Sequence, residues 1–381
     1  MIRAENSAVF PSQAKQIEKD GEIMKRAISL FTALIIILSF TSCGLNKSAV
    51  AVESVSVTDC AGRAVEVPAD PQSICTLCPY TGMLITVLGF ADRVTSTCNN
   101  VARSNLLNEI RPEIGNAVVV KNSGDINAEE ILNLNTDLIF AEKGVLENSD
   151  QLAKLETMGI PYVLIGFETL EEQFEATRVI GNALGVPEKA EKYIEYFRNI
   201  IDSVKEKSSL ITAKKNVYHS VNEAVRTDNK GSYCDLWIEL TGALNVSAQT
   251  DGLRVEGNKS YTTLEQIYIW NPDIIICNEA MVDDYILSDP KWKGLDAVIN
   301  RQVYQIPIGV TRWGHPTSIE TPLAIMWLAR LLYPEIYDYD IDTEIRNFYK
   351  EFFSFDLSDE WIEAIKDGNN MRTPKTNKAG E

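Results

Sequence analysis

The chain has 381 residues, enough for two domains with separate hydrophobic cores. Hydrophobic residues make up 45% of it and charged residues 24%, which is typical of a globular protein and excludes a disordered or fibrous one. The formal net charge of −18 argues against binding to nucleic acid and against adsorption to an anionic membrane surface through charge. The acidity indicates no function by itself, because net charge also keeps a protein soluble.

The N-terminal segment has the features of a secretory signal. The basic stretch "MKR" at 24–26 precedes an uncharged apolar stretch at 27–40. This apolar stretch of about 14 residues is too short to span a bilayer, which takes about 20. It therefore predicts a signal peptide. We expect residues 1–42 to comprise an upstream segment and this signal, with Met24 as the true start.

The end of this signal resembles a bacterial lipoprotein cleavage site. Small residues lead directly to Cys43, with Phe40 at the position where Leu is usual. The resemblance implies lipidation of Cys43 and a tether over 43–52. No other stretch reaches 18 apolar residues, so we expect the membrane to be contacted through the lipid anchor only.

An internal repeat predicts two lobes. The segments 127–141 and 263–277 each read as a short amphipathic helix, a tight turn and a fully apolar strand. At a constant offset, identical residues align: Glu129 with Glu265, Ile131 with Ile267, Asn135 with Asn271, and Asp137 with Asp273. Fully apolar strands next to helices are typical of parallel sheets covered on both faces. We therefore expect an α/β fold with two lobes, at 53–185 and 210–366.

A long helix is predicted between the lobes, at 186–209. Its apolar residues recur on a single face: Tyr193, Phe197, Ile200 and Val204. At 1.5 Å per residue such a helix is about 30 Å long, enough to connect two lobes stiffly.

The second lobe begins with a strand over 214–221 and includes another over 302–309. A helix follows, and the spacing of Thr317 and Glu320 predicts a capping box at its N-terminus. The polar composition of 367–381 predicts a disordered tail.

The seven cysteines leave several interpretations open. Cys75 and Cys78 have a spacing seen in metal and redox sites, but no second pair follows. Cys277 ends an apolar strand, where a cysteine usually acts as a small buried hydrophobe. Structural thiols, one or two disulfides, or a metal site are all compatible with the sequence.

Candidate ligand-binding residues follow the predicted strands. In open α/β sheets, ligands bind beyond the carboxyl ends of the strands. The residues at these positions are Tyr80, Asn100, Arg103 and Lys143 in the first lobe, and Asn222, Arg226, Asn278, Arg312, Trp313 and His315 in the second.

The stretch "RWGHP" at 312–316 is the richest of these loops. Arg312 offers a fork of donors for carboxylate, catecholate or phosphate oxygens. Trp313 offers a face for stacking, and His315 a hydrogen-bond donor or a metal ligand. The alternatives are a surface ion pair, a packed aromatic ring and a histidine bonded to backbone. The other histidine, His219, lies within a strand and is expected to be packed.

Catalytic signatures are absent from the sequence. It contains no GxSxG elbow, HExxH pair, P-loop or glycine-rich dinucleotide motif. We expect no catalytic residues, no cofactor and no metal ion held by the protein alone. The enzymatic alternative would use Cys78 as nucleophile with His315, and it requires a thiol of low pKa.

Four segments in order resemble the iron-complex, haem and cobalamin substrate-binding proteins of ABC importers. They are 57–77, 126–140, 233–247 and 313–335. The first contains the family pattern Asp59, Gly62, Arg63, Val65 and Pro68, with Cys60 where a small residue is usual. The likeness covers roughly 53–367.

This resemblance implies the class III periplasmic-binding-protein fold, with two α/β lobes joined by one long rigid helix. It implies an extracytoplasmic, lipid-anchored protein that is not an enzyme. Its function would be to capture a metal chelate and deliver it to an ABC permease and its ATPase. The ligand expected first is a ferric siderophore, with haem or cobalamin as alternatives.

Two further expectations accompany the resemblance. Family members commonly dock to the permease through one acidic residue on each lobe. Here Met83 stands near the first of these positions, and Asp235 lies beside the second. A surface sensor or scaffold with the same fold, bound to a protein partner, is the remaining alternative.

Overall fold

The computed structural model describes residues 53–122, 124–257, 259–368 and 371–372. The predicted signal, the expected lipidation site Cys43 and the expected tether lie outside the described residues. Within the described part of the chain, no helix has the length and apolar character needed to cross a membrane.

The first lobe is built on a six-stranded sheet in the order β6-β5-β4-β3-β7-β8. Its strands are β3 (Ile74–Thr76), β4 (Val94–Cys98), β5 (Val118–Asn122), β6 (Asp125–Ile126), β7 (Leu138–Glu142) and β8 (Tyr162–Ile165). All pairs are parallel except that of β5 with β6. The sheet is accompanied by α2 (Pro79–Leu88), η1 (Ala91–Arg93), α3 (Asn99–Ala102), α4 (Asn105–Ile110), α5 (Pro112–Asn116), α6 (Ala128–Asn133), η2 (Lys143–Glu147), α7 (Ser149–Met158) and α8 (Leu170–Ala183).

The second lobe contains a four-stranded parallel sheet in the order β11-β9-β14-β15. Its strands are β9 (Asn216–Ser220), β11 (Leu244–Asn245), β14 (Ile274–Cys277) and β15 (Val303–Gln305). A small antiparallel sheet adds β10 (Arg226–Thr227), β12 (Arg254–Glu256) and β13 (Lys259–Tyr261). The helices are α10 (Tyr233–Leu240), α11 (Leu264–Trp270), α12 (Val282–Ser288), α13 (Asp296–Ile299), α14 (Thr321–Leu332), α15 (Ile341–Phe353) and α16 (Asp359–Asp367).

The sequence repeat corresponds to a repeat of structure. In each lobe a short helix, α6 or α11, leads into a strand, β7 or β14. This strand pairs with the first strand of the sheet in sequence order, which is β3 in the first lobe and β9 in the second. The turn needs a left-handed residue, and the aligned Asn135 and Asn271 supply it at φ 51° and 38°. Asparagine tolerates this conformation better than most side chains.

The aligned aspartates also have one role in both lobes. Asp137 accepts a hydrogen bond from the Ser73 backbone N–H at 3.2 Å, directly before β3. Asp273 accepts one from the Asn216 N–H at 2.8 Å, at the start of β9. Each carboxylate thus fixes the register between neighbouring parallel strands, which explains why the repeat retains it.

The opening family motif forms a turn after β1 (Ser54–Thr58), which pairs with β2 (Ala64–Pro68). The Asp59 carboxylate accepts from the backbone N–H groups of Ala61, Arg63 and Leu164. It also forms an ion pair with the Arg63 guanidinium at 2.7 Å. Gly62 adopts a φ of 79° in this turn. These residues are structural and anchor the hairpin to β8.

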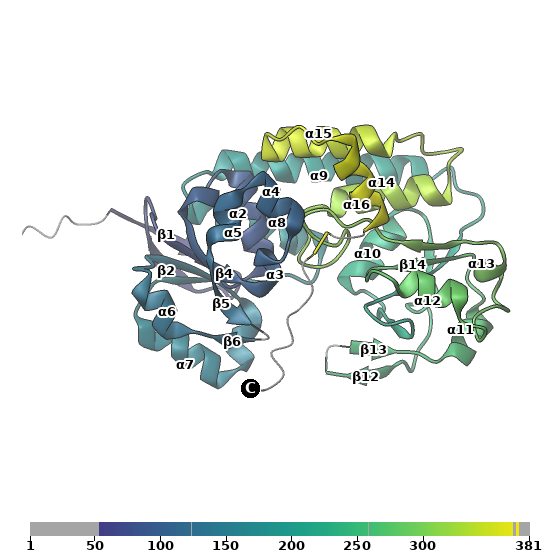
Figure 1. The fold of residues 1–381 in the computed structure, drawn as a ribbon, viewed down its shortest axis with the longest axis horizontal. Helices are drawn as coiled ribbons and strands as arrows, with labels where there is room; N and C mark the ends of the chain where they lie inside the picture. The colour runs from purple at the N-terminus through teal and green to yellow at the C-terminus, as the bar shows by residue number, and fades with distance from the viewer. Residues whose placement is uncertain (1–52, 123, 258, 369–370, 373–381) are drawn as a thin grey trace, which may run out of the picture. The chain divides into compact units, whose positions relative to one another are not determined.

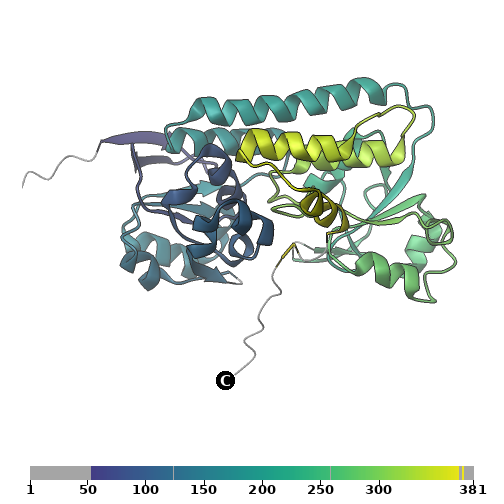
Figure 2. The same ribbon diagram turned by 45° about the horizontal axis from the view of Figure 1, so that its top comes forward.

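Helix α9 (Pro187–Ser208) connects the lobes and runs beside α15 across both of them (Figure 1; Figure 2). Tyr193, Phe197 and Val204 are fully buried, as the apolar face predicts. The Tyr193 hydroxyl donates to the Ile319 carbonyl of the second lobe at 2.8 Å. One continuous apolar core extends from the first lobe through α9 into the second. The α/β architecture and the long connecting helix are therefore confirmed.

The predicted capping box at α14 is wrong. The helix begins at Thr321 with Glu320 at its N-cap, and it has no side-chain cap. The Glu320 side chain is fully buried and bonds to residues outside the helix instead. The glutamate of this Ser/Thr-x-x-Glu pattern therefore forms tertiary hydrogen bonds and does not cap the helix.

The C-terminal segment differs from the expected tail at its four described residues. Asp367 is the last residue of α16, and Gly368 follows at the helix C-cap. Met371 is only 1% exposed, and Arg372 forms an isolated β-bridge with Ser104 in the first lobe. The expectation of disorder from residue 367 is thus wrong for these four residues. The other residues of the predicted tail beyond Gly368 lie outside the described residues.

Candidate ligand-binding site

Three of the predicted arginines come from separate elements at the carboxyl ends of strands. Arg103 ends α3, directly after β4, and Arg226 lies in β10, shortly after β9. Arg312 lies in the loop between β15 and α14. Because these strands are parallel within their own sheets, the loops after them emerge at the carboxyl edge of each sheet.

The loop that carries Arg312 is held in one conformation. Arg312 forms an isolated bridge with Ile308, which turns the chain back on itself. Gly314 follows with φ 68°, and a Cβ there would lie 2.5 Å from the Trp237 ring. The Trp237 indole N–H donates to the Gly314 carbonyl at 2.9 Å. Only glycine fits this approach, so the spacing between Arg312 and His315 is fixed.

A buried carboxylate supports the same loop from below. The Glu320 carboxylate accepts from the Thr311 N–H at 2.8 Å and the Thr311 hydroxyl at 3.1 Å. The Tyr349 hydroxyl donates to Glu320 and lies 3.0 Å from the Val310 nitrogen. A Cβ at Gly309 would lie 1.8 Å from a Glu320 oxygen, so the loop packs directly on the carboxylate.

Arg312 is a buried cation with an incomplete set of partners. Its side chain is 14% exposed, and Nη1 donates to Asn222 Oδ1 and, at 2.6 Å, to Glu279 Oε2. Within the described residues its Nε has no hydrogen-bond partner. Burial lowers the pKa of Arg312, and the Glu279 carboxylate partly opposes this shift.

Arg103, Arg226 and Arg372 each interact electrostatically with Arg312, and we call these four residues the arginine cluster. Arg226 and Arg103 both lower the pKa of Arg312 further. Burial, followed by the charges of Arg312 and Arg103, lowers the pKa of Arg372 to about 10. Glu279 is the carboxylate that opposes these shifts at Arg103, Arg312 and Arg372.

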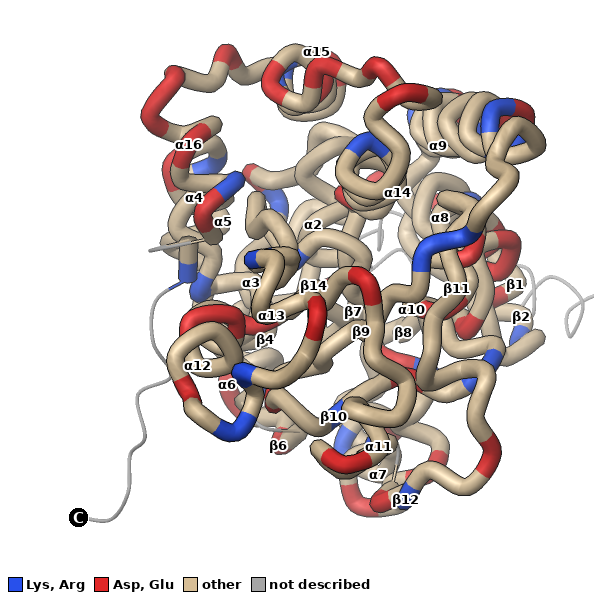
Figure 3. The backbone as a smooth tube through the Cα atoms, turned by 90° about the vertical axis from the view of Figure 1, so that its right-hand side faces the viewer, with Lys and Arg blue, Asp and Glu red and all other residues tan. Residues whose placement is uncertain are grey.

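The cluster carries a local excess of positive charge in a strongly acidic protein. Its four arginines are opposed by the Glu279 carboxylate, which pairs with Arg312 at 2.6 Å. The whole chain has a formal charge of −18, and acidic positions are frequent on α12, α15 and α16 (Figure 3). Since partly buried like charges repel one another, this arrangement is suited to an anion.

His315 lies beside the cluster as a neutral imidazole. Its Nδ1 accepts from the Thr317 N–H at 3.2 Å, which assigns the ring proton to Nε2. Burial, followed by the charges of Arg312 and Arg372, holds the pKa of His315 well below its usual value. At neutral pH the histidine can therefore donate a hydrogen bond through Nε2 without adding charge.

This depressed pKa predicts a pH-dependent stability. Between the folded pKa of His315 and about 6.5, the unfolded state binds more protons. We expect the free energy of unfolding of the ligand-free protein to fall as pH decreases below about 6.5. His315→Asn, whose Oδ1 can replace Nδ1 as acceptor, should lose less stability between pH 7.5 and 5.5. Urea unfolding at both pH values measures this, and equal losses in the two proteins would contradict it.

Several predicted contacts are corrected by burial. Tyr80 is 1% exposed, packs edge-on against Phe167 and shares a 2.6 Å hydrogen bond with Thr177. Trp313 is fully buried. Asn278 is 1% exposed and accepts from the Asn222 N–H. It therefore stabilises the loop after β9 and is not available to a ligand. Tyr80 and Trp313 thus complete the core, where their large apolar surfaces are most stable, and offer no stacking face.

Asn100 and Lys143 lie in other surroundings. Asn100 borders a pocket of about 200 Å³ at the carboxyl ends of β4 and β7. Lys121, which was not among the predicted residues, also lines this pocket and pairs with Glu142 at 2.5 Å. Lys121 lies at the carboxyl end of β5, so the rule that ligands bind beyond the carboxyl ends of strands could have identified it from the sequence. Lys143 is exposed in η2 and lines a different cavity.

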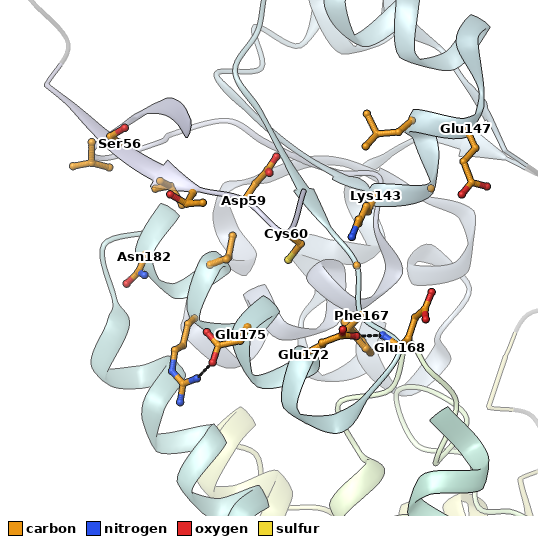
Figure 4. Close-up of a pocket in the computed structure, with 18 residues that line it drawn as sticks. Ser56, Asp59, Cys60, Lys143, Glu147, Phe167, Glu168, Glu172, Glu175 and Asn182 are labelled. Atoms are coloured by element: carbon orange, nitrogen blue, oxygen red, sulfur yellow. Dashed lines mark hydrogen bonds and ion pairs between the residues drawn. The ribbon is translucent and has the colours of Figure 1, made fainter. Parts of the chain in front are cut away.

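That cavity has a volume of about 1000 Å³, and none of the arginines of the cluster lines it. It lies between β1, η2 and α8 (Figure 4). Five of its lining residues are carboxylates: Asp59, Glu147, Glu168, Glu172 and Glu175. Glu172 belongs to the capping box of α8, and Glu175 pairs with Arg178. Its lining disfavours an anion, so volume alone does not identify the site.

One group of side chains could hold a metal ion. His219, Asp228 and Cys234 offer ligand atoms within 4.8 Å of one another, and all three residues are buried. They already bond within the protein, because His219 Nδ1 lies 2.5 Å from Asp228 and the Cys234 thiol donates to the Gly314 carbonyl. As expected, His219 is packed, here against Trp237 at 6.3 Å between ring centroids.

The cysteines do not provide a reactive thiol. All six in the described residues are free, so the disulfide alternative is wrong for them. Burial raises the pKa of Cys78 to about 12, which is the opposite of what a nucleophile needs. The pKa of Cys75 is also raised to about 12 by burial. The enzymatic alternative is therefore wrong.

Of the two expected docking positions, neither presents an accessible carboxylate. Met83 is 1% exposed within α2. Asp235 is 2% exposed and accepts from the Gly231 N–H at 2.8 Å, because it closes the turn before α10. Both residues are therefore structural in the described part of the chain.

Comparison with known proteins agrees with this architecture. The model of the periplasmic binding protein family matches residues 75–308. The molybdate-binding protein MolA of Haemophilus influenzae is 24% identical over 325 residues, covering 78% of this chain and 90% of that protein. An uncharacterized ABC transporter substrate-binding lipoprotein of Bacillus subtilis, YvrC, is 24% identical over 298 residues, covering 76% and 89%.

Solved structures show the same fold. A periplasmic solute-binding protein from Veillonella parvula aligns with a TM-score of 0.71 and 26% identity, covering 83% of this chain and 97% of that one. MolA of Haemophilus influenzae bound to molybdate aligns with a TM-score of 0.69 and 20% identity, covering 80% and 99%. The chain belongs to the periplasmic binding protein family and is the extracytoplasmic solute-binding component of an ABC importer, which binds a small ligand for a permease and is not an enzyme.

Proposed function

We propose that this protein captures an anionic metal species at the arginine cluster and delivers it to its ABC permease. The observation that carries the proposal is the group of four arginines, partly buried and opposed by Glu279, that comes from loops of both lobes. Repulsion among partly desolvated arginines raises the free energy of the empty site. A bound anion therefore reduces this repulsion as well as accepting hydrogen bonds.

The available donors match an oxygen-rich ligand. Arg312 Nε has no hydrogen-bond partner within the described residues, whereas Nη1 bonds to Asn222 and Glu279. The neutral His315 contributes Nε2–H. Guanidinium groups bind carboxylate, catecholate and oxyanion oxygens with two parallel hydrogen bonds, which gives both affinity and orientation. We therefore propose Arg103, Arg226, Arg312 and His315 as ligand-binding residues.

Two ligand classes fit this chemistry. A ferric siderophore with an anionic iron centre is the first candidate, since its deprotonated oxygens match several arginines at once. A metal oxyanion is the second, because MolA, which resembles this chain over most of its length, is a molybdate-binding protein. Haem and cobalamin have less support, because the predicted stacking residues Tyr80 and Trp313 are buried.

The test is an equilibrium titration of protein that begins at Leu45, followed by calorimetry. The probes are sodium molybdate, a ferric tris-catecholate, a neutral ferric hydroxamate, haemin and cyanocobalamin. We expect saturable binding of molybdate or the catecholate, with affinity that falls as salt increases. Binding of only the neutral hydroxamate or cobalamin, independent of salt, would contradict an anion site. Binding of none, together with capture of a sensor kinase instead of a permease, would favour the sensor alternative.

We further propose that lipid on Cys43 anchors the protein to the membrane. The apolar stretch before Cys43 and the likeness to the lipoprotein YvrC support this proposal. We expect the full chain, expressed in a bacterium, to partition with detergent, and Cys43→Ser to partition with the aqueous phase. Continued detergent partitioning of Cys43→Ser would exclude lipid on this residue.

A further inference from the structure

The end of the described chain crosses from the second lobe to the first. Helix α16 ends at Gly368, which adopts φ 67°. Three residues later the Met371 carbonyl accepts from the Asn105 N–H of α4 at 3.0 Å. Arg372 then bridges Ser104, and its Nη2 donates to the Asn100 carbonyl at 3.2 Å. This pair is thus held by α3, α4 and the turn between them.

The contact is part of the packed interior. Met371 is 1% exposed and belongs to the continuous apolar core. Ser104, its neighbour on α4, is 1% exposed and donates through its hydroxyl to the Val310 carbonyl at 2.7 Å. Val310 lies two residues before Arg312, so the same contact reaches the loop that carries Arg312. The backbone of Met371 and Arg372 is therefore fixed by its contacts with Ser104 and Asn105.

The position of the Arg372 side chain is energetically unfavourable in the ligand-free protein. Its Nε is buried, and within the described residues it has no hydrogen-bond partner. The charges of Arg312 and Arg103 act on it, opposed by Glu279. A buried, partly unpartnered cation beside two others is unfavourable unless another group compensates it.

We infer that Arg372 binds the ligand directly, so that the C-terminal segment supplies a cation to the site from outside both sheets. This inference rests on the proposed function and adds a residue to it. An anion that accepts from Arg312 and Arg372 would bond to a loop of the second lobe and to the segment seated on α3 and α4. Ligand binding would then strengthen a contact between the lobes that the apo protein already has.

The test uses protein that begins at Leu45 and continues to Glu381, with molybdate and a ferric tris-catecholate as probes. The variants are Arg372→Gln, Arg372→Lys, Arg312→Ala and the control Arg254→Gln. Arg254 is also an arginine near a carboxylate, but it is exposed on β12. We expect Arg372→Gln to weaken the bound probe about 10- to 100-fold, as for loss of a charge-assisted hydrogen bond.

Two further readouts separate ligand contact from a structural role. Arg372→Lys keeps the charge and should recover part of the affinity. Without ligand, Arg372→Gln should melt at or above the temperature of the unaltered protein, since it removes repulsion. A lowered melting temperature without ligand, together with no recovery by lysine, would make Arg372 a structural residue and overturn the inference.

The remaining outcomes distinguish the two proposals. If Arg312→Ala weakens binding while Arg372→Gln binds as well as Arg254→Gln, the inference is wrong and the proposed function stands. If both substitutions leave the affinity unchanged, or the unaltered protein binds neither probe, the anion site itself is wrong and the inference falls with it.

Discussion

Arg312→Ala is expected to weaken binding of the anionic ligand by about 1.5–3 kcal/mol, or roughly 10- to 100-fold. The substitution removes the donors at Nε and Nη2 and leaves Glu279 without its 2.6 Å partner. The freed carboxylate then adds a negative charge where the ligand's oxygens approach. Titration of the variant with the ligand identified for the unaltered protein measures the effect.

The matched control is Arg254→Ala. Arg254 pairs with Glu256 at 3.1 Å, and its side chain is largely exposed. The Arg254→Ala substitution therefore removes the same charge from the protein but leaves the four residues of the arginine cluster in place. Unchanged affinity in a correctly folded Arg312→Ala protein would remove this residue from the site.

Glu320→Ala is expected to lower the free energy of unfolding by about 3 kcal/mol. The Thr311 N–H, the Thr311 hydroxyl and the Tyr349 hydroxyl lose their acceptor in a fully buried place. Each such group costs about 1–3 kcal/mol, and relief of the buried charge offsets part of the sum. Urea unfolding measures the change, with Glu256→Ala on the exposed β12 as the control.

The same variant should also weaken ligand binding, because the Glu320 network positions the loop before Arg312. Val310 and Thr311 are both held through it. A loss of stability below 1 kcal/mol would show that the loop does not depend on this carboxylate.

The architecture was predictable from the sequence because it repeats a pattern. The helix-turn-strand segments share an asparagine that tolerates positive φ and an aspartate that receives backbone N–H groups. Both roles depend on chemistry that few other residues supply. The apolar face of α9 was equally readable, since helical periodicity follows from geometry alone.

The site was predictable only in part, because strand ends give the position of a loop but not the direction of its side chains. Arg312 joins the cluster, whereas its neighbour Trp313 turns into the core. The difference follows from the turn at Gly314 and its contact with Trp237, which lies 77 residues away in sequence.

Two residues could not be assigned from local sequence at all. Glu320 matches a capping box, yet its partner Tyr349 is 29 residues further along the chain. Arg372 stands in a polar segment whose composition predicts disorder, yet it bridges Ser104 of the first lobe. In both cases the decisive contact is tertiary, and no pattern within ten residues encodes it.

The central claim is that an anionic metal species binds at the arginine cluster. The most direct test is a crystal structure of the loaded protein with diffraction data collected at the absorption edge of the bound metal. We expect one strong anomalous peak whose ligand oxygens lie within hydrogen-bond distance of the Arg312 guanidinium. A peak at the buried group of His219, Asp228 and Cys234, or in the acidic cavity lined by Glu172, would contradict it.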